Sequence, residues 1–201
     1  NPTLEEMQKH LYVGKNLLTD VYCRYGLQLL NSSLERVVAD PSDLAARSDT
    51  MLAAYCGGMA LNTAGTAATH ALQSPIGGLT HTPHGFGVGA LLPYVMRFNL
   101  PARVSVFAEL GRLLGVADTT DDELTQAKAG IERVDALLTA VGAPGDLKEL
   151  GVNEDDLELI AEQSMLSTRL LANNPREMTQ ADALEVLRRA YRGDRSYWPA
   201  S

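Results

Sequence analysis

The sequence predicts an all-α domain of about seven to nine helices. Three observations predict this fold class. Apolar residues recur at helical spacing along most of the chain, and capping residues with glycine or proline breaks separate these segments. No run of alternating apolar and polar residues, enriched in β-branched side chains, predicts a strand. Because the chain contains no internal repeat or long linker, residues 1–201 are predicted to form a single helical domain.

The first half of the chain is predicted to begin with two long helices, over residues 17–38 and about 42–62. Asp40 and Pro41 supply a cap and a first-turn proline for the second of them. That helix contains Gly57-Gly58, and each interior glycine costs roughly 1 kcal/mol relative to alanine. We therefore expect another helix to approach closely at this point.

The rest of the chain shows a further series of start and stop signals. A small-residue helix reaches His70 and is expected to end one turn later, at Pro75 and Gly77-Gly78. Two later helices are predicted over residues 86–98 and 101–114. Three more begin at capping signals: one runs from the capping box of Thr120 and Glu123 to Val141, one from the Asn153 cap to Leu170, and one over 183–191 after a Thr179–Asp182 cap. Asn173-Asn174-Pro175 reads as a turn, and Tyr197 with Trp198 as a tail that packs back on the domain.

The composition excludes several classes of partner. Lys and Arg number 17 against 25 Asp and Glu, so the net charge of -8 opposes a phosphate backbone, and we expect no nucleic-acid partner. No apolar run approaches the roughly 18 residues of a membrane span, and no signal-peptide pattern opens the chain. The sequence therefore predicts a cytoplasmic protein without a membrane partner, and Cys23 and Cys56 are interpreted as reduced core residues.

Histidines are concentrated in one short segment. Three of the four, His70, His81 and His84, fall beside helix breakers where the chain reverses between two helices. Such a reversal can bring His70 and His84 to a common point, as a metal ion requires of neutral imidazoles. Taken alone, the pattern is equally compatible with a buried His70 and a helix-capping His84.

A second candidate pair lies near the start of the chain. Glu6 and His10 stand at positions i and i+4, so they share one helix face and can hold one cation. The alternative is a solvated surface pair. The nearby glycines of 85–89 lack the lysine and the preceding strand of a phosphate-binding loop, and helix packing explains them better.

The residues around the histidines match a known pattern. Residues 64–99, AGTAATHALQSPIGGLTHTPHGFGVGALLPYVMRFN, resemble the helical metal-binding domain of the iron-containing, or group III, alcohol dehydrogenases. Members carry a small-residue helix, a histidine, paired glycines, Pro-His-Gly, Leu-Pro and a closing Phe-Asn or Tyr-Asn. The resemblance covers nearly the whole chain and implies the C-terminal helical domain of the dehydroquinate synthase-like fold.

The resemblance also implies a site. The family holds its metal with an aspartate and a histidine four residues later, then with two histidines fourteen residues apart, which correspond here to Glu6, His10, His70 and His84. His70, His84 and His81 are the predicted catalytic residues. His81 could line the substrate pocket or relay protons, but its threonine neighbours and loop position favour an exposed loop histidine. Two positions depart from the family: Glu6 replaces the usual aspartate, and Ser74 stands where many members carry another histidine.

The implied activity is metal-dependent alcohol oxidation or aldehyde reduction. The resemblance implies Fe²⁺, with Zn²⁺ as the alternative from the affinity order, and NAD or NADP bound mainly by an N-terminal α/β domain that this sequence lacks. It further implies a small alcohol or aldehyde substrate, a homo-oligomer, and a chain that is inactive alone. The alternative is a catalytically inactive helical scaffold or interaction domain of the same fold.

Overall fold

The computed structural model describes residues 14–116 and 122–199, and within these ranges the chain forms nine α-helices, two 3₁₀ helices and no strand. The α-helices are α2 (Leu17–Ala39), α3 (Leu44–Ala64), α4 (Ala68–Thr80), α5 (His84–Asn99), α6 (Val104–Leu113), α7 (Glu123–Ala140), α8 (Leu157–Ser164), α9 (Thr168–Ala172) and α10 (Gln180–Arg192). The 3₁₀ helices are η1 (Leu100–Ala102) and η2 (Glu154–Asp156). The predicted all-α class is confirmed.

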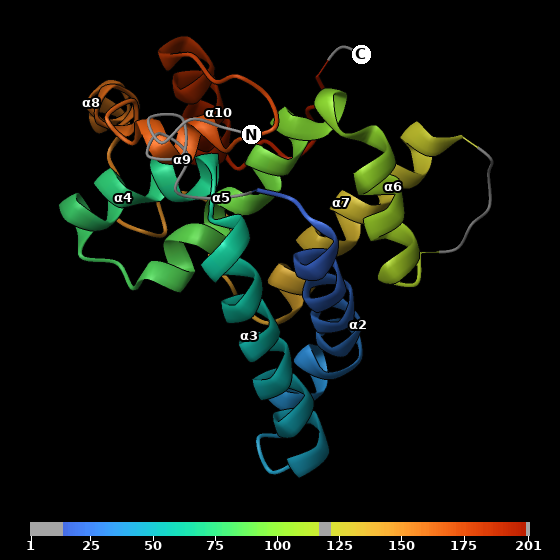
Figure 1. Ribbon diagram of the computed structural model, residues 1–201. Coiled ribbons are helices and arrows are strands. Elements are labelled where there is room, and N and C mark those ends of the chain that lie inside the picture. The colour runs from blue at the N-terminus through green and yellow to red at the C-terminus, as the bar shows by residue number, and fades with distance from the viewer. Residues whose placement is uncertain (1–13, 117–121, 200–201) are drawn as a thin grey trace.

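The helices fall into three groups (Figure 1). Helices α4, α5, α8, α9 and α10 form the main body, and α6 and α7 pack as a pair beside it. Helices α2 and α3 form a hairpin that projects away from the body. None of the described helices is long and apolar enough to cross a membrane.

Helix α5 joins the two apolar cores of the domain. Its residues Leu91 and Phe98 belong to the main core, which α4, α8, α10 and the loop near Leu147 complete. Met96 on the same helix belongs to a smaller core formed with α6 and α7. Because α5 is buried on nearly all sides from residue 93 onward, it is the central helix of the body.

Side-chain caps determine where four of the nine described α-helices begin. The Thr179–Asp182 capping box at α10 is present as predicted. Helix α3 is capped by Asp43, which accepts from the backbone N–H of Ala46, and Asp40 instead ends α2. Asp122 caps α7, whereas Thr120, the residue predicted for that role, lies outside the described residues.

Two helices differ from the expected boundaries. Helix α4 continues through Pro75 and Gly77 to Thr80, because Ile76 is fully buried in the main core and packing there outweighs the local breaker signals. The segment after Asn153 divides into η2, α8 and α9 instead of one helix. A capping box between Asn153 and Asp156 opens its first turn, which is a 3₁₀ helix.

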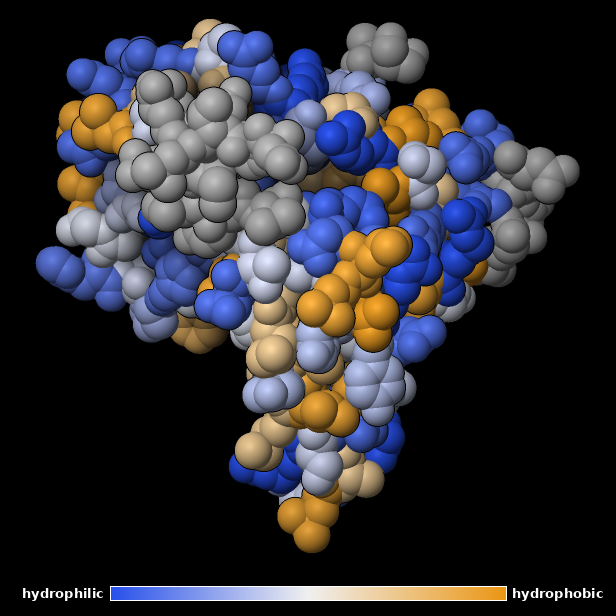
Figure 2. Space-filling model, in the orientation of Figure 1, coloured by the Kyte–Doolittle hydropathy of each residue, from blue (hydrophilic) through white to orange (hydrophobic). Residues whose placement is uncertain are grey.

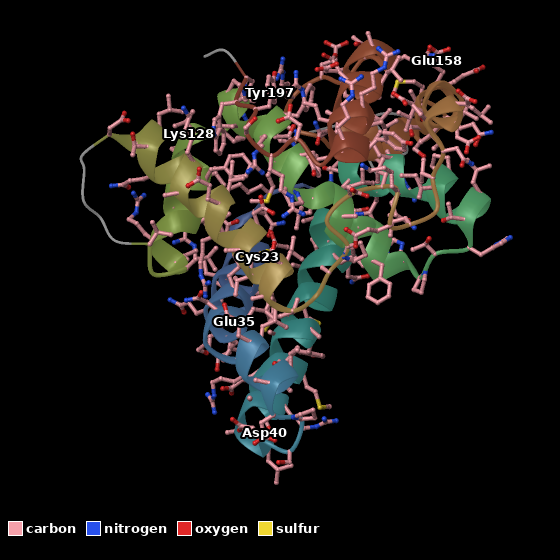
Figure 3. The ribbon with its side chains drawn as sticks, turned by 180° about the vertical axis from the view of Figure 1, so that it is seen from behind. Cys23, Glu35, Asp40, Lys128, Glu158 and Tyr197 are labelled. Carbon is pink, nitrogen blue, oxygen red and sulfur yellow. The ribbon has the colours of Figure 1, made fainter. Side chains whose placement is uncertain are left out.

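The α2–α3 hairpin is held together by small side chains. A Cβ atom added at Gly26 would stand 3.1 Å from the Cβ of Cys56, so the two helices approach closely there. Large apolar side chains lie on the outside, and Leu17 at the base is 87% exposed; Figure 2 shows apolar residues on this surface. Glu35 lies part-way along the hairpin and Asp40 at its tip (Figure 3).

The expected close approach at Gly57-Gly58 is wrong for the described residues. A Cβ atom at either glycine would meet nothing within 4 Å. The tightest crossing is instead between α6 and α7, where a Cβ at Gly130 would lie 2.7 Å from the backbone nitrogen of Gly111. Cys56 is buried as expected but Cys23 is exposed, and both are free thiols.

The C-terminal tail packs back on the domain, as predicted. The guanidinium of Arg97 lies 4.9 Å from the ring centre of Trp198, and the guanidinium of Arg189 lies 3.7 Å from that of Tyr197. Arg97 is buried and pairs with Asp135, with 3.2 Å between nitrogen and oxygen. A cation stacked on an aromatic ring accounts for the ordered position of these residues beyond α10.

Candidate metal centre

The candidate site is built where the chain turns from α4 to α5. His70 lies in the first turn of α4, and His84 is the first residue of α5. His81 ends α4 in the left-handed conformation, with φ 54°, and the chain then returns alongside α4. A hydrogen bond holds the loop between the two helices in place: the hydroxyl of Thr82 donates to the carbonyl of Leu150 at 3.2 Å.

The two imidazole rings lie close together across this turn. The ring centroids of His70 and His84 are 5.0 Å apart, and the ring planes are inclined by 53°. With ring nitrogens about 2.1 Å from an ion and roughly tetrahedral angles, the centres of two coordinating rings lie about 5 Å apart. The observed spacing therefore fits two imidazoles that share one divalent ion.

The protonation of His70 also suits a metal ligand. Burial lowers the pKa of His70 below its ordinary value of 6.5, and the neighbouring ring of His84 lowers it further. A neutral imidazole keeps a lone pair, which is the form that binds a metal. At neutral pH the partly buried His70 is thus prepared to donate to a cation.

A buried amide supports the second ring. The Nδ1 atom of His84 is 2.8 Å from the Oε1 atom of Gln73. Sequence reasoning missed Gln73, because it comes close to His84 only through the fold. The available signal was its place one turn before Gly77 on the same helix face, where glycine leaves room for a long side chain.

The start of α4 is held by two asparagines from a distant part of the chain. Asn174 accepts from the backbone N–H of Ala68 at 3.4 Å and exchanges two hydrogen bonds with Asn99, at 3.0 and 2.8 Å. Asn173 donates to the carbonyls of Ala64 and Thr66, at 2.9 and 3.1 Å. The predicted turn at this position is therefore also the clamp that fixes the helix carrying His70.

The other predicted site residues are either outside the described part of the chain or exposed. Glu6 and His10 lie outside the described residues. His81 and Ser74 are exposed. Within the described ranges, no group of three or more His, Cys, Asp or Glu side chains gathers to hold a metal. The described part of the site is thus a pair of histidines with an amide behind one of them.

Comparison with known proteins identifies the family. Residues 7–191 match the family model described as the C-terminal part of the Fe-containing alcohol dehydrogenase family. The chain therefore belongs to the Fe-containing alcohol dehydrogenase family, of which it represents the C-terminal helical part.

Individual relatives agree with this assignment. The chain is 32% identical to the 1,3-propanediol dehydrogenase of Klebsiella pneumoniae over 90% of its own length and 47% of that protein. It is 28% identical to the NAD-dependent methanol dehydrogenase of Bacillus methanolicus, over 92% and 48% of the two chains. An alcohol dehydrogenase structure from Oenococcus oeni matches with a TM-score of 0.83 and 34% identity, over 91% of this chain and 48% of that one. The chain thus spans about half the length of these relatives.

Proposed function

We propose that this chain is the metal- and substrate-binding part of an NAD(P)-dependent alcohol dehydrogenase, which interconverts a primary or secondary alcohol and its aldehyde or ketone. The observation that carries the proposal is the 5.0 Å separation of the His70 and His84 rings, in a chain of the Fe-containing alcohol dehydrogenase family. The names of two relatives, a 1,3-propanediol and a methanol dehydrogenase, support small alcohols as the substrate class.

The proposed ligands are Glu6, His10, His70 and His84. Three imidazoles and one carboxylate suit a divalent transition metal, and the family's description favours Fe²⁺, while the general affinity order favours Zn²⁺ over Fe²⁺. For the two ligands that the structure describes, the ring spacing and the lowered pKa of His70 both support this assignment.

The chain's own residues have three tasks in this proposal. His70 and His84 would hold the cation, and the lowered pKa of His70 favours the neutral ring, whose lone pair can bind a metal. Gln73 orients the His84 ring from behind. His81 lies exposed at the end of α4 and is proposed to line the substrate side of the site. A bound divalent cation supplies Lewis acidity toward the oxygen of an alcohol or carbonyl compound.

The nicotinamide cofactor, NAD or NADP, supplies hydride transfer. The described part of the chain has no strand followed by a glycine-rich turn, which is the usual binding site for a dinucleotide. We therefore assign most of the cofactor binding to an α/β domain of the whole enzyme. The coverage of only 47% of the Klebsiella pneumoniae relative agrees with this division. A homo-oligomeric enzyme is part of the same proposal.

Metal analysis of the purified chain tests the proposal. We expect one equivalent of Fe²⁺, loaded without oxygen, or of Zn²⁺, and we expect it to be lost in His70→Ala and in His84→Ala. His81→Asn is the matched control, because asparagine tolerates the left-handed conformation and His81 is not a proposed ligand. A folded native chain that retains no metal would support the inactive scaffold instead. Alcohol-dependent reduction of NAD should be undetectable for this chain alone.

A further inference from the structure

The amide of Gln73 is almost completely enclosed. Its side chain belongs to α4, and the residue is 5% exposed. A buried amide requires hydrogen-bond partners, and its Oε1 atom finds one in Nδ1 of His84 at 2.8 Å. An amide oxygen can only accept a hydrogen bond, so this contact requires the proton of a singly protonated His84 ring to lie on Nδ1. The second nitrogen, Nε2, then keeps its lone pair.

Two glycines, one on each helix, form the slot that contains this amide. A Cβ atom at Gly77 of α4 would stand 2.8 Å from Nε2 of Gln73. A Cβ atom at Gly87 of α5 would stand 2.7 Å from Cγ of the same side chain. By contrast, a Cβ at Gly78 or at Gly85 would meet nothing within 4 Å. The space is therefore shaped around Gln73 from both sides.

The ring that the amide holds has little other support. His84 is exposed and stands at the first position of α5, so core packing does not fix the orientation of its imidazole. His70, in contrast, is partly buried between Thr69 and Ala71, both of which are buried. The hydrogen bond from Nδ1 to Gln73 is thus the contact that limits rotation of the exposed ring.

From these contacts we infer that Gln73 is a positioning residue, which holds His84 as the Nδ1–H tautomer and thereby turns Nε2 toward His70. The metal-binding part of this inference rests on the proposed function, but the tautomer is a property of the chain itself. Partners behind a metal-binding histidine typically change metal affinity about 10- to 100-fold when they are removed.

The tautomer provides a direct test without metal. We would record long-range ¹H–¹⁵N spectra of the metal-free chain at pH about 8.5, well above the ordinary histidine pKa of about 6.5. The native His84 should show a protonated Nδ1 and an unprotonated Nε2. In Gln73→Leu, which removes the acceptor at similar size, the ring should shift toward the Nε2–H form that free imidazole side chains favour. An unchanged tautomer in Gln73→Leu would overturn the inference.

Metal affinity provides the second measurement. Titration with Zn²⁺ in a calorimeter should give about 10- to 100-fold weaker binding for Gln73→Leu than for the native chain. Gln73→Glu should restore the affinity, because a carboxylate of the same length also accepts from Nδ1. A purely structural role predicts the reverse order, since leucine suits a buried position and an added carboxylate does not. Equal affinities for the native chain and Gln73→Leu would contradict the inference.

The glycines offer a matched pair of variants. Gly77→Ala crowds the end of the Gln73 side chain, which can move aside without unfolding the helix, so both the tautomer and the Zn²⁺ affinity should change as in Gln73→Leu. Gly78→Ala, one residue further on, should leave both unchanged. The native chain could show the expected tautomer, and Gln73→Leu could lose it, while the native chain binds no Zn²⁺. In that case the role of Gln73 stands and the proposed function fails.

Discussion

The α4–α5 pair and the α2–α3 hairpin are both made of consecutive helices, yet they are stabilised differently. Helices α4 and α5 bury large side chains, among them Leu72, Ile76 and Leu91, in a core that α8 and α10 complete. The hairpin buries mainly small residues between its two helices and leaves large apolar ones outside. The site histidines therefore lie where several helices fix the backbone. The stability of the hairpin comes chiefly from the contacts between its own two helices.

The largest expected effect is a break in the α4–α5 core. Leu91→Ala removes a side chain that is 0% exposed, and it should lower the free energy of unfolding by about 2–5 kcal/mol. Urea denaturation followed by circular dichroism measures this change. Leu61→Ala on α3, where the leucine is 49% exposed, is the control and should stay within about 0.5 kcal/mol. Similar losses in both variants would mean that the two regions do not differ as described.

A smaller effect is expected where the hairpin helices meet. Gly26→Leu places a side chain where Cys56 and the backbone of Ala53 already stand, and overpacking of this kind costs about 1–3 kcal/mol. Hydrogen exchange should accelerate in α2 and α3 but not in α4 and α5. Gly57→Ala, on the open outer face of α3, should instead stabilise the chain by up to about 1 kcal/mol. Faster exchange throughout α5 in Gly26→Leu would show that the hairpin and the body unfold together.

The smallest effect concerns the cap of α3 and its pH dependence. The backbone N–H of Ala46 and the guanidinium of Arg36 hold the pKa of Asp43 below its usual value. Because the folded state favours the ionised carboxylate, the stabilisation is complete above the unfolded pKa of about 3.9 and is lost as the pH falls through the lower folded value.

Asp43→Ala should therefore lower the melting temperature at pH about 7 and reduce the loss of stability below pH about 4. Thermal unfolding at several pH values provides the measurement. Asp49→Ala, the same exchange further along α3, should not lower the melting temperature, because alanine is a strong helix former. If the pH dependence of unfolding is unchanged in Asp43→Ala, the cap does not contribute to the stability of the hairpin.

Sequence patterns predict the features that depend on neighbouring residues. The all-α class, the helix cap at Thr179 and Asp182, and the turn that brings His70 toward His84 all follow from local spacing. Local signals mislead where packing from elsewhere outweighs them. Pro75 marks a helix end by the usual rule, but burial of Ile76 in the main core keeps α4 intact beyond it.

The candidate site was predictable only in part for the same reason. The spacing of His70 and His84, with the family resemblance, is enough to suggest a shared ion, and the 5.0 Å between their ring centroids agrees with it. The glycine one turn after Gln73 is a weak signal, because a glutamine in a helix is ordinarily a surface residue. Its contact with His84 exists only once α5 has folded back against α4, where Gly77 and Gly87 leave room for the glutamine side chain.

The amide pair between Asn99 and Asn174 has a consequence for the durability of the protein. Asparagine side chains degrade when the next backbone nitrogen attacks the amide carbon and expels ammonia through a cyclic imide. The residue after Asn174 is Pro175, whose nitrogen carries no hydrogen, so this cyclisation is blocked. This route of chemical ageing is therefore closed at a side chain that ties α4 to both α5 and the segment before α10.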